Sequence, residues 1–286
     1  MIYTLKNNLV QIDVNDHGAE VENLSYDGLR IIRAKDEIWG RSAPLLFPIV
    51  GCLKDGYTVI NGTKYFLTKH GFLRDHDWQL LNKESDQITF VDKYSESSLK
   101  LYPYKYEAYV TYKLLDKGLK TTIKIKNIDN ANFKFNIGGH PGIKCPLFDG
   151  DKFNDYKVVF EKEESFSCPM YFDGLWDFNK PSFTFNKIKE LDIDYKYFLI
   201  DAFVIKNINS RKVSLLNKKN QGISFSFDGF NTLALWTKPN ANYLCFEPWC
   251  GYDDLVSSNH NYLEKDDLIE IKPGEEKEFS YTIELI

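Results

Sequence analysis

Hydrophobic and polar residues alternate in short runs along most of this chain, and turn-forming residues separate the runs. Alternation with a period of two is typical of strands with one buried face, whereas the spacing of amphipathic helices is almost absent. Asn61-Gly62, between two such runs, indicates a two-residue hairpin turn. Short helical turns are expected only near 95–102 and 253–259. The predicted strands are 9–14, 57–60, 64–67, 78–81, 87–91, 106–115, 120–128, 133–137, 157–160, 196–205, 213–216, 222–227, 233–236, 243–246 and 278–285.

Many short strands with frequent turns predict an all-β fold, a large antiparallel β-sandwich or a barrel. The chain has no internal repeat, low-complexity tract or flexible linker, so residues 1–286 are predicted to form a single β domain. The segment from Trp39 to Gly51 is apolar but contains two prolines, which favours an irregular crossing segment or an edge strand. Arg41 in this segment is either a structural arginine or a ligand-binding one.

His140 is the first candidate for chemistry. It follows the predicted strand 133–137 and is flanked by Gly138, Gly139 and Pro141, so we expect a stiff strand-to-loop junction. Gly138, Gly139 and Gly142 are expected to leave open space around the imidazole for a ligand. An imidazole exchanges protons near neutral pH, so His140 could act as an acid or base, although a core histidine is the simpler alternative.

A second candidate stretch runs from Lys69 to Trp78. If residues 70–74 form a strand, His70, Phe72 and Arg74 point the same way and place an imidazole and a guanidinium on one face. Arginine provides fixed donors suited to hydroxyls and carboxylates. A surface arginine paired with Asp75 or Asp77 is the alternative interpretation.

The third stretch contains Glu247, which directly follows the predicted strand 243–246 and precedes Pro248 and Trp249. Phe246, Pro248 and Trp249 are expected to enclose and partly desolvate this carboxylate, raise its pKa and make it a better base. A salt bridge at a strand end is the alternative. Trp236 and Trp249 are rings of the kind that contact sugars, and Asp201 could orient a hydroxyl or cap a turn.

Composition and charge narrow the classes of function. Aromatic residues make up 15% of the chain and the net charge is −5, which disfavours nucleic acid or an anionic membrane as the partner. The five cysteines form no Cys-x-x-Cys pair, so we expect free thiols, no metal site and a cytoplasmic protein without a secretion signal. Motifs of serine hydrolases, phosphate-binding loops and zinc helices are absent, but Asp201 and Glu247 could be the two carboxylates of a glycosidase.

Four motifs follow one another along the chain: Ala-Pro-Leu-Leu-Phe-Pro-Ile-Val-Gly at 43–51, His-Gly-Phe-Leu-Arg at 70–74, Gly-Gly-His-Pro at 138–141 and Phe-Glu-Pro-Trp-Cys-Gly at 246–251. In this order they resemble the aldose 1-epimerase family, most closely its LacX-like branch. The resemblance covers essentially the whole chain and implies a galactose mutarotase-like supersandwich fold and the interconversion of the α and β anomers of a hexose, without a cofactor.

The resemblance also assigns roles. His140 is similar to the acid that protonates the ring oxygen, and Glu247 to the base that takes the proton of the C1 hydroxyl. His70, Arg74 and, with no sharp motif, Asp201 are similar to residues that bind the sugar.

One departure from the family bears on the substrate. Cys52 stands where relatives commonly carry an arginine. Losing a charge-assisted partner should weaken phosphate recognition, so we expect an unphosphorylated hexose such as galactose or glucose. A hexose 6-phosphate mutarotase and a catalytically silent carbohydrate-binding or regulatory protein remain the alternatives, and the chain is expected to be a monomer or homodimer.

Overall fold

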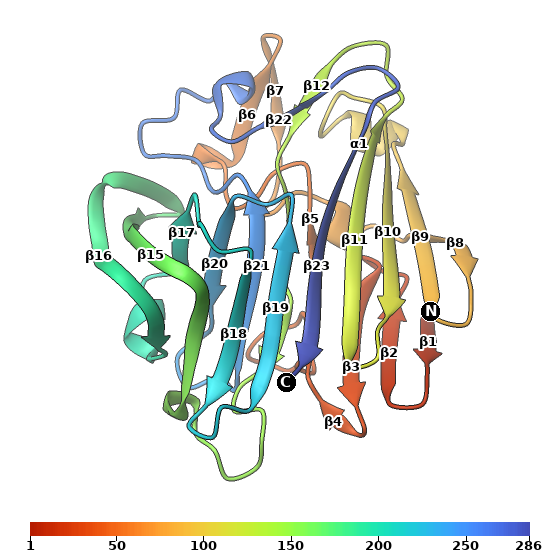
Figure 1. Ribbon diagram of the computed structural model, residues 1–286. Helices are drawn as coiled ribbons and strands as arrows, with labels where there is room; N and C mark the ends of the chain where they lie inside the picture. Colours follow the sequence, from red (N-terminus) through yellow and green to blue (C-terminus); the bar gives the residue numbers. More distant parts are fainter.

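The computed structural model describes all residues from Met1 to Ile286, and antiparallel strands dominate it (Figure 1). The largest sheet has nine strands in the order β16-β15-β18-β19-β23-β11-β10-β9-β8. Its strands are β8 (Gln79–Lys83), β9 (Gln87–Lys93), β10 (Tyr106–Leu114), β11 (Gly118–Asn127), β15 (Tyr156–Phe172), β16 (Leu175–Asp192), β18 (Lys212–Asn217), β19 (Gly222–Asp228) and β23 (Glu276–Leu285). This architecture confirms the predicted all-β fold.

Two further sheets complete the layers. A four-stranded sheet contains β1 (Ile2–Lys6), β2 (Val10–Asn15), β3 (Glu20–Tyr26) and β4 (Leu29–Arg30). A six-stranded sheet contains β5 (Leu45–Leu46), β13 (Ile137–Gly139), β14 (Gly142–Lys144), β17 (Phe203–Lys206), β20 (Thr232–Trp236) and β21 (Tyr243–Cys250), in the order β17-β20-β21-β13-β5 with β14 also on β21.

The remaining elements are small. Two two-stranded sheets, drawn at the top of Figure 1, are the hairpin of β6 (Tyr57–Ile60) with β7 (Thr63–Phe66), and the pair of β12 (Phe133–Phe135) with β22 (Ile269–Ile271). The one α-helix, α1, spans Glu96–Leu99, and 3-10 turns span Lys54–Gly56, Leu73–Asp75 (η2), Phe153–Asp155, Tyr195–Phe198 and Tyr262–Glu264. No helix has both the length and the apolar composition needed to cross a membrane.

The core lies between the nine-stranded sheet and the other two. On the four-stranded side, the rings of Tyr3 and Phe90 meet edge to face at 5.4 Å. On the six-stranded side, the rings of Phe225 and Phe246 lie 5.4 Å apart. Phe90, Phe225 and Phe246 belong to one cluster of 64 buried residues, and the partly buried Tyr3 packs against it, which supports the proposal of a single domain.

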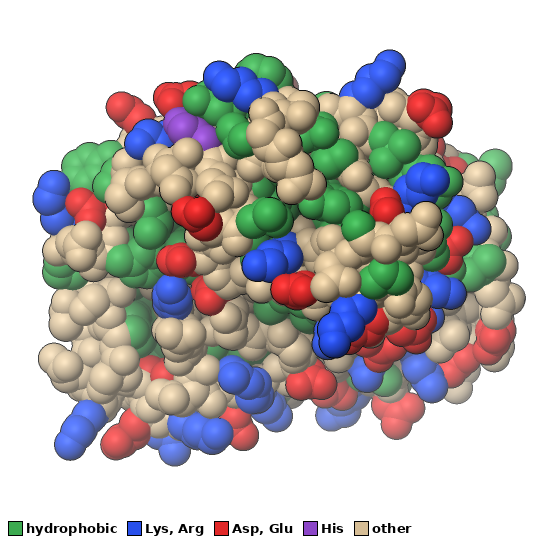
Figure 2. Space-filling model, turned by 90° about the horizontal axis from the view of Figure 1, so that it is seen from above, with side chains coloured by type: hydrophobic (Ala, Val, Ile, Leu, Met, Phe, Trp, Pro, Cys, Tyr) green, Lys and Arg blue, Asp and Glu red, His purple; other side chains and the backbone are tan.

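The surface agrees with the modest net charge. Figure 2 shows basic and acidic side chains interspersed over the face that it draws, rather than a large patch of one sign. Such a surface provides no strong field to attract a polyanion.

A buried hydroxyl links β10 to the residue that precedes β3. Tyr112, which is fully buried, donates a hydrogen bond of 2.6 Å to the carbonyl oxygen of Ala19. We expect Tyr112→Phe to lower the free energy of unfolding in urea by about 1–2 kcal/mol, because it strands a buried carbonyl. Tyr109→Phe on the same strand is the control, since the Tyr109 hydroxyl is only partly buried and bonds to the Glu107 carboxylate instead of to a backbone carbonyl. Equal effects of the two substitutions would contradict this explanation.

Two segments differ from the sequence-based expectation. The predicted strand 196–205 is instead a 3-10 turn, Tyr195–Phe198, followed by the short β17. The predicted helical turn near 253–259 is absent, whereas the one near 95–102 is confirmed by α1. The long strand β16 was not predicted, because much of it is exposed and Pro181 interrupts its alternation.

Candidate active site

A cavity of about 260 Å³ lies on the side of the six-stranded sheet that faces away from the main core. The volume suits one small polar ligand rather than an extended chain. The twelve residues that line it are Trp39, Lys69, His70, Arg74, His140, Asp201, Ala202, Trp236, Lys238, Glu247, Trp249 and Asp253.

The strand β21 sends Glu247 into this cavity. Every residue of β21 is buried, because the strand is covered on both faces. Leu244, Phe246 and Cys250 belong to the main core, so the alternating positions, including Glu247 and Trp249, face the other side. Contrary to our expectation, Phe246 therefore lies on the opposite face and does not enclose the carboxylate.

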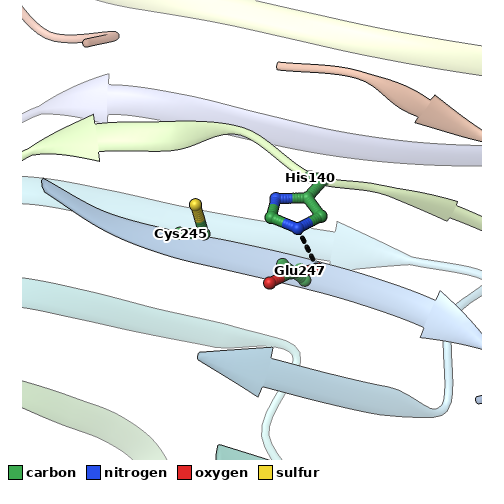
Figure 3. Close-up of side chains that lie close together, drawn as sticks. All are labelled: His140, Cys245 and Glu247. Carbon is green, nitrogen blue, oxygen red and sulfur yellow. Dashed lines mark ion pairs between the residues drawn. The ribbon is translucent and has the colours of Figure 1, made fainter. Parts of the chain in front are cut away.

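His140 faces Glu247 because of strand register. Gly138 of β13 pairs with Trp249, and Gly142 of β14 pairs with Cys245. His140 lies midway between Gly138 and Gly142, and Glu247 lies midway between Cys245 and Trp249. His140 therefore stands opposite Glu247, and side chains that are opposite each other on one face come into contact. Figure 3 shows the two side chains reaching toward each other from these neighbouring segments.

The pair is short and enclosed. His140 Nε2 lies 3.0 Å from Glu247 Oε2, and the two side chains expose 8% and 1% of their surface. Burial raises the pKa of Glu247, and the adjacent imidazole of His140 offsets only part of this effect. This carboxylate therefore takes up a proton more readily than an exposed glutamate does.

The glycines beside His140 serve packing rather than ligand access, which corrects our expectation. A Cβ atom on Gly138 would lie 2.6 Å from Cδ1 of Trp249, and one on Gly139 would lie 2.6 Å from Cε1 of Tyr281. A Cβ on Gly142 would lie 2.9 Å from Cδ of Arg33. Rings and side chains fill the space, and the tight fit fixes the backbone that carries His140.

His70 enters the cavity from a turn, not from the strand that we expected. His70 and Gly71 both have positive φ, and Leu73–Asp75 forms the 3-10 turn η2, so Phe72 points into the main core instead. The His70 Nδ1 atom accepts a hydrogen bond of 3.0 Å from the Gly51 backbone N–H, which leaves a proton for Nε2. Burial lowers the pKa of His70 well below its usual value, so the ring is neutral.

Arg74 lines the cavity, whereas Arg41 does not. Arg74 donates from Nη2 to the Lys69 carbonyl at 2.6 Å, and Arg41 Nη1 donates to the Arg74 carbonyl at 2.8 Å. Arg41 also pairs with Asp75 and with buried Glu20. Its guanidinium is thus occupied by protein groups, and we assign Arg41 to holding the Arg74 turn rather than to contact with a ligand.

Aromatic rings surround the imidazole of His140. The Trp39 ring lies 4.9 Å from the His140 ring, and Trp236 meets it edge-on at 5.6 Å. Trp249 lies beside His70. Flat apolar walls around a few polar groups are typical of sites that bind a sugar ring. Trp39 was not among our candidates, because an isolated tryptophan in an irregular segment shows no pattern.

Charged side chains line another part of the cavity. Lys69 Nζ lies 3.5 Å from Asp201 Oδ2, and the buried carboxylate of Asp253 lies in the same lining. Neither Lys69 nor Asp253 was a candidate from the sequence, since a lone lysine or a loop aspartate usually indicates a solvated surface.

Cys245, on β21, lies beside the pair formed by His140 and Glu247 (Figure 3). One ligand atom each from His140, Cys245 and Glu247 lie within 4.8 Å of one another, so these three residues could together hold a divalent cation such as Zn²⁺. Burial raises the pKa of the Cys245 thiol well above its ordinary value, so the thiol is neutral and a poor nucleophile.

Comparisons with known proteins identify the family and the fold. A family model described as Aldose 1-epimerase matches residues 1–284. The plasmid-encoded Protein LacX of Lactococcus lactis subsp. lactis is 30% identical over 298 residues, covering 100% of both chains. The structure of a galactose mutarotase related enzyme from Lactobacillus acidophilus superposes with a TM-score of 0.92 at 29% identity, covering 100% of this chain and 97% of that one.

A galactose mutarotase-like protein from Lactobacillus casei also superposes with a TM-score of 0.92, at 23% identity and with 100% of both chains covered, which concerns the fold alone. The fold is therefore the galactose mutarotase-like sandwich that the four sequence motifs implied.

Proposed function

This chain belongs to the aldose 1-epimerase family, and from that premise we propose that it is a mutarotase that interconverts the α and β anomers of a free hexose such as galactose or glucose. The observation that carries the proposal is the direct contact of His140 with Glu247 in a cavity large enough for a single sugar. We further propose that it works in the cytoplasm, because all five cysteines are free thiols.

The reaction needs one proton donor and one proton acceptor. In this proposal the O1–C1–O5 unit of the sugar replaces the direct contact between the two side chains. Glu247 takes the proton of the O1 hydroxyl while His140, as the imidazolium, gives a proton to the ring oxygen O5, and the C1–O5 bond breaks.

The product of this step is the open-chain aldehyde, which loses no group and stays bound in the cavity. Rotation about the C1–C2 bond exposes the other face of the carbonyl to the C5 hydroxyl. Ring closure then reverses both transfers: His140 takes the proton from the C5 hydroxyl, and Glu247 returns its proton to O1. The protein ends with the protons it started with, so the cycle needs no redox partner.

The remaining lining residues fit binding and orientation. The neutral His70 carries a proton on Nε2 that it can donate to a hydroxyl, and Arg74 brings further donors. Trp39 and Trp236 pack around the His140 ring, limit access of water and support the imidazole orientation.

Polarimetry of freshly dissolved α-galactose and α-glucose tests the proposal. The wild-type protein should accelerate the decay of optical rotation, and His140→Ala should reduce kcat/KM on the order of 10³-fold, since each acid–base group contributes about 10²–10⁴-fold. His17→Ala, at a solvated histidine that pairs with Asp77, is the control and should keep full activity.

The competing function is a catalytically silent carbohydrate-binding protein. It predicts that galactose quenches the tryptophan fluorescence of the cavity while the optical rotation decays only at the spontaneous rate. That pair of results, obtained with every common hexose and hexose phosphate, would reject the enzymatic proposal.

A further inference from the structure

Lys69 is fixed in the cavity by the loop that also positions His70. Its backbone carbonyl accepts the hydrogen bond from Arg74 Nη2, and its ammonium group lies 3.5 Å from Asp201 Oδ2. Burial lowers the pKa of Lys69, but the charges of Asp253 and Asp201 outweigh it and leave the pKa raised. Lys69 is therefore a cation with three N–H donors whose contacts with the protein are long: 3.5 Å to Asp201 Oδ2 and 5.9 Å to the centre of the Tyr171 ring.

The two carboxylates beside Lys69 are held by the protein. Asp253 accepts from the Cys52 backbone N–H at 2.7 Å and from the Trp176 indole N–H at 2.9 Å. Asp201 accepts from the Ala202 backbone N–H at 2.7 Å. Neither can swing away cheaply when a ligand enters, because each would lose these bonds.

We propose that Lys69 is a specificity-determining residue that donates hydrogen bonds to hydroxyls of the bound sugar, while Asp201 and Asp253 beside it restrict the cavity to uncharged sugars. This rests on the proposed function and deepens it. A neutral polyol can accept from Lys69 and donate to a carboxylate at once. A phosphate or a hexuronate carboxylate can only accept, and it would be repelled by both aspartates.

The other two cations of the cavity, Arg74 and Lys238, already bind protein groups. Arg74 already donates to the Lys69 carbonyl and lies 3.7 Å from Asp75. Lys238 donates to the carbonyl oxygen of Ile38. Each of these side chains keeps N–H donors without a partner, such as Nε of Arg74, and sugar hydroxyls can accept from them as a phosphate can, so it is the two aspartates that disfavour an anion.

Neither Cys52 nor Arg41 provides a positive charge beside Asp201 and Asp253, which leaves this role to Lys69. Burial raises the pKa of the Cys52 thiol to about 11, so the side chain is neutral and contributes no charge. Arg41 is engaged by Glu20 and Asp75 away from the cavity lining. Lys69 is thus the positive group that lies nearest the carboxylates of Asp201 and Asp253 within the lining.

The decisive experiment compares kcat/KM for galactose, glucose and their 6-phosphates. Wild-type protein should favour the neutral sugars. Lys69→Met should lower kcat/KM for them on the order of 30-fold, the range for losing charge-assisted hydrogen bonds. Asp201→Asn should raise the activity on phosphates relative to neutral sugars about tenfold. Lys157→Met, which breaks the Lys157–Glu190 pair on the distant β15–β16 hairpin, should change nothing.

Deoxy sugars show whether Lys69 touches the ligand. Removing the hydroxyl that Lys69 binds from galactose should slow the wild-type enzyme, whereas Lys69→Met should treat that deoxygalactose and galactose alike. A wild-type preference for the 6-phosphates, or a Lys69→Met variant within threefold of wild type on galactose, would overturn the proposal. The proposal would also be overturned if the ratio of kcat/KM for galactose to kcat/KM for each deoxygalactose were the same in Lys69→Met as in the wild-type protein.

A tryptophan-fluorescence titration separates this proposal from the proposed function. If no sugar is turned over, the mutarotase proposal fails, yet Lys69→Met should still weaken the binding of galactose by a similar factor. Equal dissociation constants of the two proteins for galactose would then overturn the role of Lys69 independently. Circular dichroism of each variant ensures that only folded protein is compared.

Discussion

Glu247→Gln is expected to abolish mutarotation, with kcat/KM falling on the order of 10³-fold, because an amide cannot accept the O1 proton. The amide keeps the size of the side chain, so binding of galactose should persist. Polarimetry together with a fluorescence titration measures both. In the wild-type enzyme, kcat/KM should rise with pH through the raised pKa of Glu247, above the range of an ordinary glutamate, and this acidic limb should vanish in the variant.

The same substitution should stabilise the protein at neutral pH. Because the folded pKa of Glu247 is raised, its contribution to stability is fully present below the ordinary pKa and is lost as pH rises through the folded pKa. Glutamine removes that loss, so the melting temperature should increase at pH 7.5 and stay unchanged near pH 4. A variant less stable than wild type at pH 7.5 would contradict the burial argument.

Glu164→Gln provides a matched control at another buried carboxylate. Glu164 is 2% exposed and accepts hydrogen bonds from backbone and side-chain donors of Asn209 and Ser210. An amide cannot accept with both ends, so this variant should lose stability while keeping its activity. The change in stability should thus be positive for Glu247→Gln and negative for Glu164→Gln. This difference separates the effect of removing a buried charge from the effect of removing hydrogen bonds.

Gly71→Ala is expected to destabilise the protein by about 2–5 kcal/mol and to displace His70. Gly71 has φ +71°, and a Cβ atom there would lie 2.1 Å from the Phe47 carbonyl oxygen and 2.8 Å from the Pro48 nitrogen. The left-handed conformation costs a residue with a side chain about 1–2 kcal/mol, and overpacking adds about 1–3 kcal/mol. Urea unfolding and polarimetry should show losses of both stability and activity.

Gly62→Ala separates the two contributions. Gly62 also has a positive φ of +80°, in the β6–β7 turn, but a Cβ atom there meets nothing within 4 Å. It should cost about 1 kcal/mol and leave activity intact. If the two alanine variants were equally stable, contact with the Phe47 backbone would not be what requires glycine at position 71.

Local pattern was enough to predict most strands, because a strand with one buried face alternates visibly in sequence. The expected segment 57–60 coincides with β6, and 106–115 differs from β10 by one residue. The pattern failed where tertiary contacts decide the conformation: β16 has a largely exposed surface, and the His70 turn follows from its bonds with Gly51 rather than from alternation.

Prediction of the site had the same limit. His140 and Glu247 stood out because each is a titratable residue among glycines, prolines or apolar neighbours, but only strand register shows that they are opposite each other. Lys69, Asp253 and Trp39 enter the cavity through contacts between distant segments, and no local signal marks them. Arg41 has the chemistry of a ligand-binding residue, yet it forms ion pairs with the buried Glu20 and the exposed Asp75 instead.

A crystal structure of Glu247→Gln with bound galactose tests most directly whether this pair of side chains acts on the anomeric centre. We predict that O5 of the sugar lies within hydrogen-bond distance of His140 Nε2 and that O1 lies within the same distance of the amide introduced at position 247, in both anomers. A sugar whose C1 points to solvent, or whose anomeric oxygens contact only Asp201, would contradict it.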